Sequence, residues 1–346
     1  MSDPLRVAIL GYGWVTRNFH IPMIAAVPGL SVEVLGTARI EAVKGEKPRA
    51  RVASLEEAAT APDVDVVVVA TVNDLHVRLA ELALRAGKHV VVERPFTSTL
   101  REARHLVELA KATGRCVTVF QNRRWDSDFL TVRKAIENGV VGEVVHFESS
   151  LDWFIPQVKA AWREEPGPAA GTWFDLAPHL ADQALLLFGS PQSVSLHLAA
   201  QRVGARTDDW FHAVLDYGRR QVILHASQLA KGGSPRFRVH GTAGTLVKPA
   251  ADPQEEQLLQ GMRPTDAGFG LDSDNALFYA ASSAQPQYRP AVRGDQSQFY
   301  VQLERAIRGK GAYPVTHDEA LAVMSILEAG IRSAAEQRAV VPEGIH

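Results

Sequence analysis

The sequence predicts an α/β protein whose N-terminal part is a doubly wound parallel sheet. Short apolar runs at 5–10, 31–36, 64–70, 89–92 and 116–120 alternate with segments whose apolar residues recur at helical spacing. The run at 64–70 is almost continuously β-branched, which is typical of a parallel strand buried on both faces. The chain has 346 residues, 46% of them hydrophobic, and is long enough for two domains with separate cores.

The first apolar run ends in a glycine turn that precedes a helical pattern. Gly11 permits a tight turn, and Gly13 lets the backbone approach a pyrophosphate, which the amides of a helix N-terminus can bind. Thr16 replaces the third glycine of the usual pattern, so we expect the helix to sit slightly further from the strand. The turn predicts a dinucleotide site to which Trp14 and Val15 also contribute.

The end of the second strand bears on which nucleotide is bound. An acidic residue at this point binds the ribose hydroxyls of NAD, whereas a small residue followed by arginine suits the 2′-phosphate of NADP. Thr37 and Arg39 stand here, and we expect Glu33 to lie inside the strand and to point away from the ligand. These residues favour NADP and leave NAD possible; an ordinary surface charge is the alternative for Arg39.

Polar residues follow the three remaining strands of this part. Ligands of open α/β sheets bind at the carboxyl edge, so we expect these residues to line the nucleotide or substrate site. The nucleotide-binding candidates are Thr71, Asn73, His76, Glu93, Arg94 and Gln121, and the substrate-binding candidates are Asn122, Arg123 and Trp125.

The strongest candidate for chemistry is the pair Asp175 and His179, which precedes an apolar stretch of helical spacing. If the helix already includes Asp175, the two residues share one face. Pro178 tempers this reading, because proline belongs in the first turn of a helix. Oxidation of an alcohol needs a base for the hydroxyl proton, and a histidine oriented by a carboxylate suits that task. A capping aspartate and a packed histidine are the alternative.

The second half of the sequence predicts strands that pair in antiparallel fashion. They are expected from 144 to 151 and near 193–202, 209–217, 220–229 and 236–247, with a turn at Tyr217–Arg220. The histidines His197, His212, His225 and His240 are then strand residues. The stretch 249–295 is expected to be a long loop or irregular insertion, and 317–337 a core-packing helix.

Several segments, in this order, resemble the glucose–fructose oxidoreductase/inositol dehydrogenase (Gfo/Idh/MocA) family: GYGWVT, TVNDLH, AGKHVVVERPFT and GTWFDLAPHLADQ. The resemblance runs from Leu5 to about Val341, and QNRRWDSDFLTVRK resembles the branch of NADP-dependent scyllo-inositol dehydrogenases. It implies a Rossmann domain, residues 1–121, followed by an α/β domain on a largely antiparallel open sheet, residues 122–346. It also implies an NAD(P)-dependent oxidoreductase of a polyol, cyclitol or sugar, and a homodimer or homotetramer formed through the open sheet.

The resemblance assigns proton transfer to His179 and substrate binding to Asp175. Arg163 is a further substrate-binding candidate, with a surface ion pair as the alternative. One departure concerns the Glu-Lys-Pro motif, whose lysine assists proton transfer in the family, because this chain has Arg94 there. With a pKa above ~12, arginine cannot relay protons near neutrality, although it can still orient a hydroxyl or a carboxylate.

Arg94 therefore leaves two alternatives to the polyol dehydrogenase. One is a catalytically silent family member that acts as a cofactor or ligand sensor. The other is a dehydrogenase for an anionic sugar acid, whose carboxylate an arginine binds bidentately.

Composition excludes several other functional classes. The net charge of −2 gives no electrostatic basis for binding nucleic acid or an anionic membrane. No stretch approaches the ~18 apolar residues of a membrane span. The single Cys116 excludes an internal disulfide framework, and no Cys/His cluster has metal-ligand spacing. We expect a cytoplasmic protein without a metal that acts on a small molecule.

Overall fold

The computed structural model describes residues 3–46, 48–158 and 164–344. The chain divides into two compact units. The first comprises Met1–Asn122, Glu255–Phe269 and Gln296–Leu321, and the second comprises Arg123–Gln254, Gly270–Asp295 and Ala322–His346. Each unit is therefore assembled from segments that are distant in the sequence.

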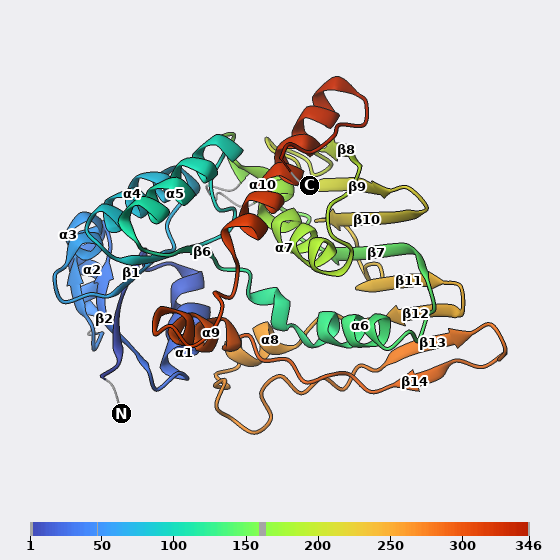
Figure 1. The fold of residues 1–346 in the computed structure, drawn as a ribbon, viewed down its shortest axis with the longest axis horizontal. Helices are drawn as coiled ribbons and strands as arrows, with labels where there is room; N and C mark the ends of the chain where they lie inside the picture. Colours follow the sequence, from blue (N-terminus) through green and yellow to red (C-terminus); the bar gives the residue numbers. More distant parts are fainter. Residues whose placement is uncertain (1–2, 47, 159–163, 345–346) are drawn as a thin grey trace. The chain divides into compact units, whose positions relative to one another are not determined.

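The first unit contains a six-stranded parallel sheet in the order β3-β2-β1-β4-β5-β6. Figure 1 labels β1, β2 and β6 of this sheet. Its strands are β1 (Leu5–Leu10), β2 (Leu30–Gly36), β3 (Arg51–Ala53), β4 (Val66–Val69), β5 (His89–Val92) and β6 (Val117–Val119). The strand order reverses between β1 and β4, which is the switch point where such sheets bind ligands. The predicted doubly wound sheet is confirmed, and β3 is an additional strand that the sequence reading missed.

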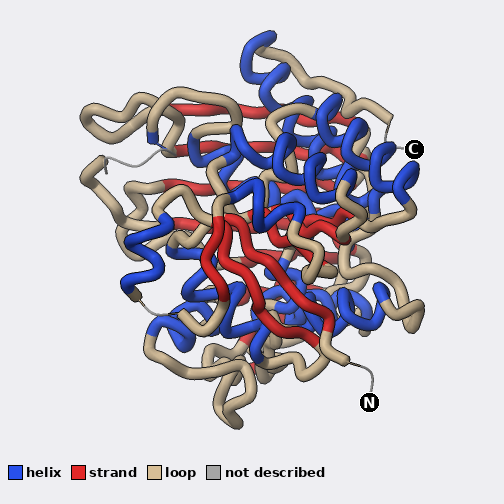
Figure 2. Tube along the Cα trace, turned by 90° about the vertical axis from the view of Figure 1, so that its left-hand side faces the viewer, coloured by secondary structure: helices blue, strands red, loops and turns tan. Residues whose placement is uncertain are grey.

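Helices surround this sheet, and Figure 2 shows its strands side by side. The helical elements of this unit include the π-helical turn η1 (Thr16–His20), α1 (Ile21–Ala25), α2 (Ile40–Gly45), α3 (Leu55–Thr60), the 3-10 turn η2 (Asn73–Leu75), α4 (His76–Arg85), α5 (Leu100–Thr113) and α9 (Gln298–Ile307). A capping box fixes the start of α5: the Thr99 side chain accepts from the backbone N–H of Glu102, whose carboxylate accepts from that of Thr99. All four residues of β4 are buried, as expected for a central parallel strand.

The second unit contains an eight-stranded sheet in the order β14-β13-β12-β11-β7-β10-β9-β8 (Figure 1). Its strands are β7 (Val144–Asp152), β8 (Ser193–Ala199), β9 (Trp210–Tyr217), β10 (Arg220–Ser227), β11 (Phe237–Gly241), β12 (Gly244–Lys248), β13 (Ala276–Ala280) and β14 (Gln287–Arg289). Neighbouring strands pair antiparallel except β7 and β10, which are parallel. The predicted, largely antiparallel second sheet is confirmed.

Helices cover one face of this second sheet. The helices that lie wholly in the second unit are α6 (Ser127–Glu137) and α7 (Gly171–Phe188). The elements η3 (Asn122–Trp125) and α10 (His317–Glu336) contain residues of both units, and α8 (Gln254–Leu259) belongs to the first unit from its second residue on. Helix α7 packs on β7, β9 and β10, and α6 packs on β12. Along β10, Val222 and Leu224 are buried toward the helices, whereas Ile223 and His225 alternate with them and are half-buried on the open face.

The predicted placement of the four histidines in strands is confirmed. His197, His212 and His225 lie opposite one another on β8, β9 and β10, and His240 lies on β11. Helix α10 confirms the expected core helix, since Ile326 and its neighbours are buried.

Two expectations for the second half were wrong. The segment expected as one strand at 236–247 is the hairpin β11–β12, in which Gly241 pairs with Gly244 across a tight turn. The stretch 249–295 is not irregular throughout, because it supplies α8 and the strands β13 and β14 that extend the sheet to its edge. No helix among the described residues has both the length and the apolar character needed to cross a membrane.

Candidate active site

The glycine turn after β1 has the geometry that a dinucleotide site needs. Gly11 has φ +98°, and a Cβ placed on it would lie 2.2 Å from the carbonyl oxygen of Ala70. Only glycine fits this position without strain. The Thr16 hydroxyl donates to the carbonyl oxygen of Gly11 at 2.8 Å, so the threonine that replaces the third glycine ties the following helical turn to the glycine turn.

Gly13 differs from Gly11 because nothing lies within 4 Å of a Cβ placed on it. Its backbone therefore faces open space, as expected where a pyrophosphate approaches. Trp14 is exposed and Val15 half-buried, and the Trp14 ring lies 5.3 Å from the ring of Phe19. The turn thus leaves room for a dinucleotide and presents an aromatic surface beside that space.

The end of β2 carries no carboxylate among Thr37, Ala38 and Arg39. Thr37 is buried, and its hydroxyl accepts from the backbone N–H of Arg39 at 3.1 Å; the Arg39 side chain is exposed. Glu33 lies at the irregularity of the β1–β2 ladder, where Val7 pairs with Val32 and Ala8 with Val34. Glu33 is therefore inside the strand rather than at its carboxyl end.

His76 joins the loops that follow β4 and β5. Its Nδ1 lies 3.0 Å from the carbonyl oxygen of Pro95, and its Nε2 lies 3.3 Å from that of Thr71. Burial lowers the pKa of this imidazole, so it is neutral and donates to only one of the two carbonyls. Asn73 is buried beside it at the start of η2.

Glu93 and Arg94 follow β5 directly. Glu93 Oε2 accepts from the backbone N–H of Arg94 at 3.0 Å and lies 4.0 Å from the Nε atom of that side chain. Its Oε1 lies 3.0 Å from Nε2 of His20, and His20 Nδ1 lies 2.6 Å from the Tyr300 hydroxyl. Gln121 and Asn122, which follow β6, are also buried in this unit.

In the second unit, α7 carries both residues of the predicted catalytic pair. The helix spans Gly171–Phe188, so Asp175 and His179 lie one turn apart on one face. Asp175 is half-buried and His179 is buried. Pro178 lies inside the helix rather than in its first turn, and the helix nevertheless includes both Asp175 and His179.

Buried ion pairs hold the following turn of α7 in place. Arg124 binds Asp182 bidentately, with Nε–Oδ2 at 2.8 Å and Nη2–Oδ1 at 2.6 Å. Gln183 donates to the carbonyl oxygen of Arg123 at 2.9 Å and accepts from Arg236 at 2.9 Å. Because these contacts follow His179 by three and four residues, they fix the orientation of its helix face.

Arg236 is the centre of a second buried cluster. It donates to Asp128 at 3.1 Å and to the hydroxyl of Ser149 at 2.7 Å, and burial lowers its pKa. The paired carboxylate compensates for the desolvation of the guanidinium. The cluster therefore connects α6, α7 and the sheet through one side chain.

The start of α7 is capped from outside the helix. The side-chain carboxylate of Asp208 accepts from the backbone N–H of Trp173 at 2.7 Å. The backbone carbonyl oxygen of Asp208 accepts from the backbone N–H of Thr172 at 2.9 Å. A Cβ on Gly171, which has φ +90°, would lie 2.0 Å from Oδ1 of Asp208. Burial raises the pKa of Asp208 to about 6.

The remaining substrate-binding candidates are distributed as follows. Arg123 donates to Asp126 at 3.1 Å, and Trp125 is half-buried, with a carbonyl oxygen that accepts from the backbone N–H of Asp295. Arg163 lies outside the described residues. The sequence reading missed His20, Tyr300, Arg124, Asp182 and Arg236 as supporting residues. Asp182 lies in GTWFDLAPHLADQ and Arg124 in QNRRWDSDFLTVRK, so these two lay in segments that resemble the family, whereas His20, Tyr300 and Arg236 lay outside them.

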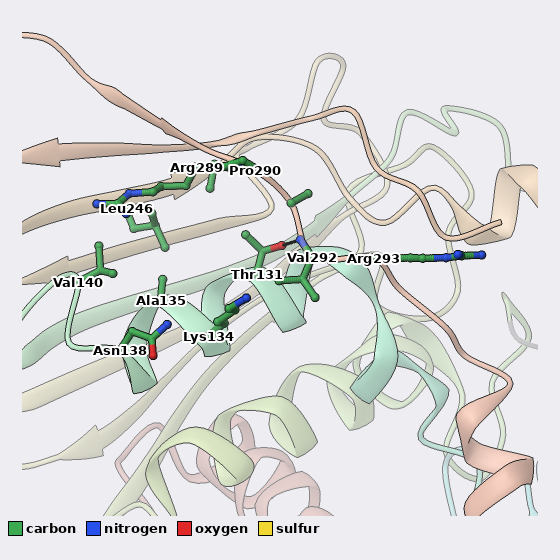
Figure 3. Close-up of a pocket in the computed structure, with 12 residues that line it drawn as sticks. Thr131, Lys134, Ala135, Asn138, Val140, Leu246, Arg289, Pro290, Val292 and Arg293 are labelled. Carbon is green, nitrogen blue, oxygen red and sulfur yellow. Dashed lines mark hydrogen bonds between the residues drawn. The ribbon is translucent and has the colours of Figure 1, made fainter. Parts of the chain in front are cut away.

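Two cavities lie away from these residues. One, of about 510 Å³, lies between α6 and the segment that follows β14, with Lys134, Leu246 and Val292 among its lining (Figure 3). The other, of about 300 Å³, lies beside Cys116 and Tyr313. Neither contains a predicted site residue. Within the described parts of the chain, no group of three or more histidine, cysteine, aspartate or glutamate residues could hold a metal ion.

Comparison with known proteins agrees with this geometry. Residues 5–121 match the model "Oxidoreductase family, NAD-binding Rossmann fold", and residues 133–342 match "Oxidoreductase family, C-terminal alpha/beta domain" of Gfo/Idh/MocA proteins. The chain belongs to the Gfo/Idh/MocA oxidoreductase family.

Relatives of this Gfo/Idh/MocA protein cover almost its whole length. It is 44% identical to the oxidoreductase YdgJ of Escherichia coli, over 96% of this chain and 97% of that one. It is 36% identical to the NADP(+) scyllo-inositol 2-dehydrogenase IolW of Bacillus subtilis, over 99% and 97%. The crystal structure of a Klebsiella pneumoniae protein superposes with a TM-score of 0.92 at 47% identity and covers 99% of this chain and 96% of that one.

This Gfo/Idh/MocA chain is therefore an oxidoreductase with an NAD-binding Rossmann domain. Its glycine turn fits such a nucleotide on structural grounds, since Gly11 closes the turn and a Cβ on Gly13 would enter the open space. Within this family's Glu-Lys-Pro motif, the chain keeps Glu93 and Pro95 and has Arg94 between them.

Proposed function

We propose that the protein is a dehydrogenase that acts on a hydroxyl group of a polyol, cyclitol or sugar, with NADP preferred over NAD. The observation that carries the proposal is the pair Asp175 and His179 on one face of α7, in a chain whose other unit has a dinucleotide-binding turn. The names of two relatives support it: IolW at 36% identity and the inositol 2-dehydrogenase of Rhizobium meliloti at 27%.

The residues proposed to hold the nucleotide follow the carboxyl ends of the first sheet. Backbone amides from Gly13 to Val15 bind the pyrophosphate, and Trp14 flanks it. Arg39, exposed beside Thr37, binds a 2′-phosphate, which is why NADP is preferred. Thr71, Asn73, His76, Glu93, Arg94 and Gln121 complete the proposed nucleotide side. When bound, the nicotinamide exchanges a hydride with the carbon that bears the hydroxyl.

His179 is proposed to take the hydroxyl proton during oxidation and to return it during reduction. Asp175, one turn before it, orients the imidazole and binds a neighbouring substrate hydroxyl. Arg94 orients the reacting hydroxyl by hydrogen bonding and remains charged throughout, since a guanidinium does not release its proton near neutrality. Asn122, Arg123, Trp125 and Arg163 are proposed to contact the remaining substrate hydroxyls.

A screen of inositols and aldoses with NADP⁺ and NAD⁺ tests this proposal. We expect the absorbance of reduced nucleotide to rise with at least one polyol, and to rise faster with NADP⁺. His179→Asn keeps a hydrogen-bonding side chain without a base and should lower kcat by about 10²–10⁴-fold. Binding of nucleotide without oxidation of any polyol or aldose would refute it.

Arg94 supports a second candidate substrate class, the anionic sugar acids, because a guanidinium binds carboxylates bidentately. The same screen separates the classes when each inositol or aldose is paired with its acid. Preference for the neutral compound excludes the anionic class. The names of the relatives do not favour a silent sensor, and activity that appears only in Arg94→Lys would be its signature.

The proposal extends to assembly and location. The open face of the second sheet is proposed to form a homodimer or homotetramer of a cytoplasmic enzyme. Light scattering of the full chain tests the assembly, and a monomer at micromolar concentration would contradict it.

A further inference from the structure

The first unit contains a buried chain of polar side chains that leads to Arg94. Tyr300 on α9 contacts His20 at the end of η1, with Oη and Nδ1 2.6 Å apart. Nε2 of the same imidazole lies 3.0 Å from Oε1 of Glu93. The second carboxylate oxygen of Glu93 accepts from the Arg94 backbone and lies beside its guanidinium. Four residues from three distant segments thus form one continuous series of contacts.

Three members of this series of polar contacts lie in an apolar environment. His20 and Tyr300 have no exposed surface, and Glu93 is 6% exposed. The Phe120 ring packs on both aromatic partners, 4.5 Å from the His20 ring and 5.7 Å from the Tyr300 ring. A buried carboxylate is costly unless neighbouring dipoles or charges stabilise it, so the contacts with His20 and Arg94 lower the cost of burying Glu93.

Burial and the nearby charge of Glu93 hold the pKa of Tyr300 well above its usual value, so the phenol keeps its proton. The Tyr300 hydroxyl donates to Nδ1 of His20 when the imidazole N–H is on Nε2, the atom that faces the carboxylate. The Nε2 contact is close without the alignment of a hydrogen bond, so its attraction is mainly electrostatic.

We propose that Tyr300 and His20 are positioning residues for Arg94. They hold the Glu93 carboxylate in one orientation through the Nε2–H tautomer of His20, and Glu93 in turn holds the backbone and the guanidinium of Arg94. This inference rests on the proposed function in one respect, that Arg94 contacts the substrate. A guanidinium suits this arrangement because it has five N–H donors and can face Glu93 while it donates others to a hydroxyl.

Tyr300→Phe tests the inference with the smallest change, since it removes only the hydroxyl that fixes the imidazole. We expect kcat for the oxidised polyol to fall about tenfold while the nucleotide dissociation constant stays within about twofold. His20→Leu should lower kcat further, and His20→Gln should recover part of the loss because its amide can donate to Glu93. The matched control is Phe299→Leu, a buried neighbour of Tyr300 that packs on Phe120 and has no polar atom to offer Glu93.

A measurement without nucleotide or substrate separates this inference from the proposed function. In the full chain with ¹⁵N-labelled histidine, we expect NMR to show the Nε2–H tautomer for His20, and Tyr300→Phe to reduce its population. An Nδ1–H tautomer in the unmodified protein would overturn the inference, as would Tyr300→Phe kinetics equal to those of Phe299→Leu. Failure of the unmodified protein to oxidise any polyol overturns the proposed function instead. In that case the His20 tautomer still decides whether Tyr300 and His20 orient Glu93.

Discussion

Substitution by alanine should affect two glycines of the same turn differently: Gly11→Ala should lower stability, and Gly13→Ala should weaken nucleotide binding. Gly11→Ala places a Cβ 2.2 Å from the Ala70 carbonyl oxygen in a backbone with φ +98°. A non-glycine residue in such a region costs about 1–3 kcal/mol, and relief of the overlap adds about 1–3 kcal/mol. We therefore expect the free energy of unfolding to fall by at least about 2 kcal/mol.

Gly13→Ala meets no atom within 4 Å and needs no positive φ. Stability should therefore change by less than about 1 kcal/mol. The added methyl group enters the space proposed for the pyrophosphate, so the dissociation constant for NADPH should rise at least about tenfold, which is about 1.4 kcal/mol. Gly45→Ala is the matched control, since its Cβ also meets nothing and it lies at the end of α2.

Nucleotide fluorescence titration and urea unfolding of the three variants and the unmodified chain provide the data. We expect a loss of stability in Gly11→Ala, a loss of nucleotide binding alone in Gly13→Ala, and neither loss in Gly45→Ala. Gly13→Ala that binds NADPH as tightly as the unmodified chain would refute the assignment of the turn to the pyrophosphate.

Two further predictions concern the residues that support α7, and a third concerns Cys116. Asp182→Asn removes the carboxylate that binds the buried Arg124 bidentately and should cost about 3–5 kcal/mol, as measured by urea unfolding; an unchanged midpoint would contradict this. The folded pKa of Asp208 is about 6, above its ordinary 3.8, so its contribution to stability is present at low pH and is lost as pH rises through this window. Asparagine at this position does not titrate. The free energy of unfolding of Asp208→Asn, relative to that of the unmodified chain, should therefore rise by about 2 kcal/mol between pH 4 and pH 7. Thermal unfolding measures this difference, and a difference that does not change with pH would contradict the prediction. Burial raises the pKa of Cys116 to about 12, so a thiol reagent should label it only after denaturation.

The sequence predicted those elements whose signals are local. The β-branched run of β4 and the Tyr217–Arg220 turn between β9 and β10 were recognised because neighbouring residues determine them. The hairpin β11–β12 was read as one strand, although Gly241 and Gly244 mark its turn. Strand β3 was missed because three residues carry too little periodicity.

The supports of the site could not be predicted, since their partners are distant in the sequence. His20 and Tyr300 are 280 residues apart, and Arg124 and Asp182 are 58 apart. Periodicity places each residue on a helix face but does not identify which residue lies opposite. Asp175 and His179 share a helix, and their helical spacing was visible in the sequence; their roles remain the proposal made above.

The most direct test of the central claim is the pH dependence of polyol oxidation with NADP⁺, compared between the unmodified chain and His179→Asn. Because the imidazole must be unprotonated to accept the hydroxyl proton, kcat/KM of the unmodified chain should rise with pH and reach a plateau, with a single ionisation. The variant should be slower and should lack this ionisation. The same profile and rate in both proteins would contradict the role of His179.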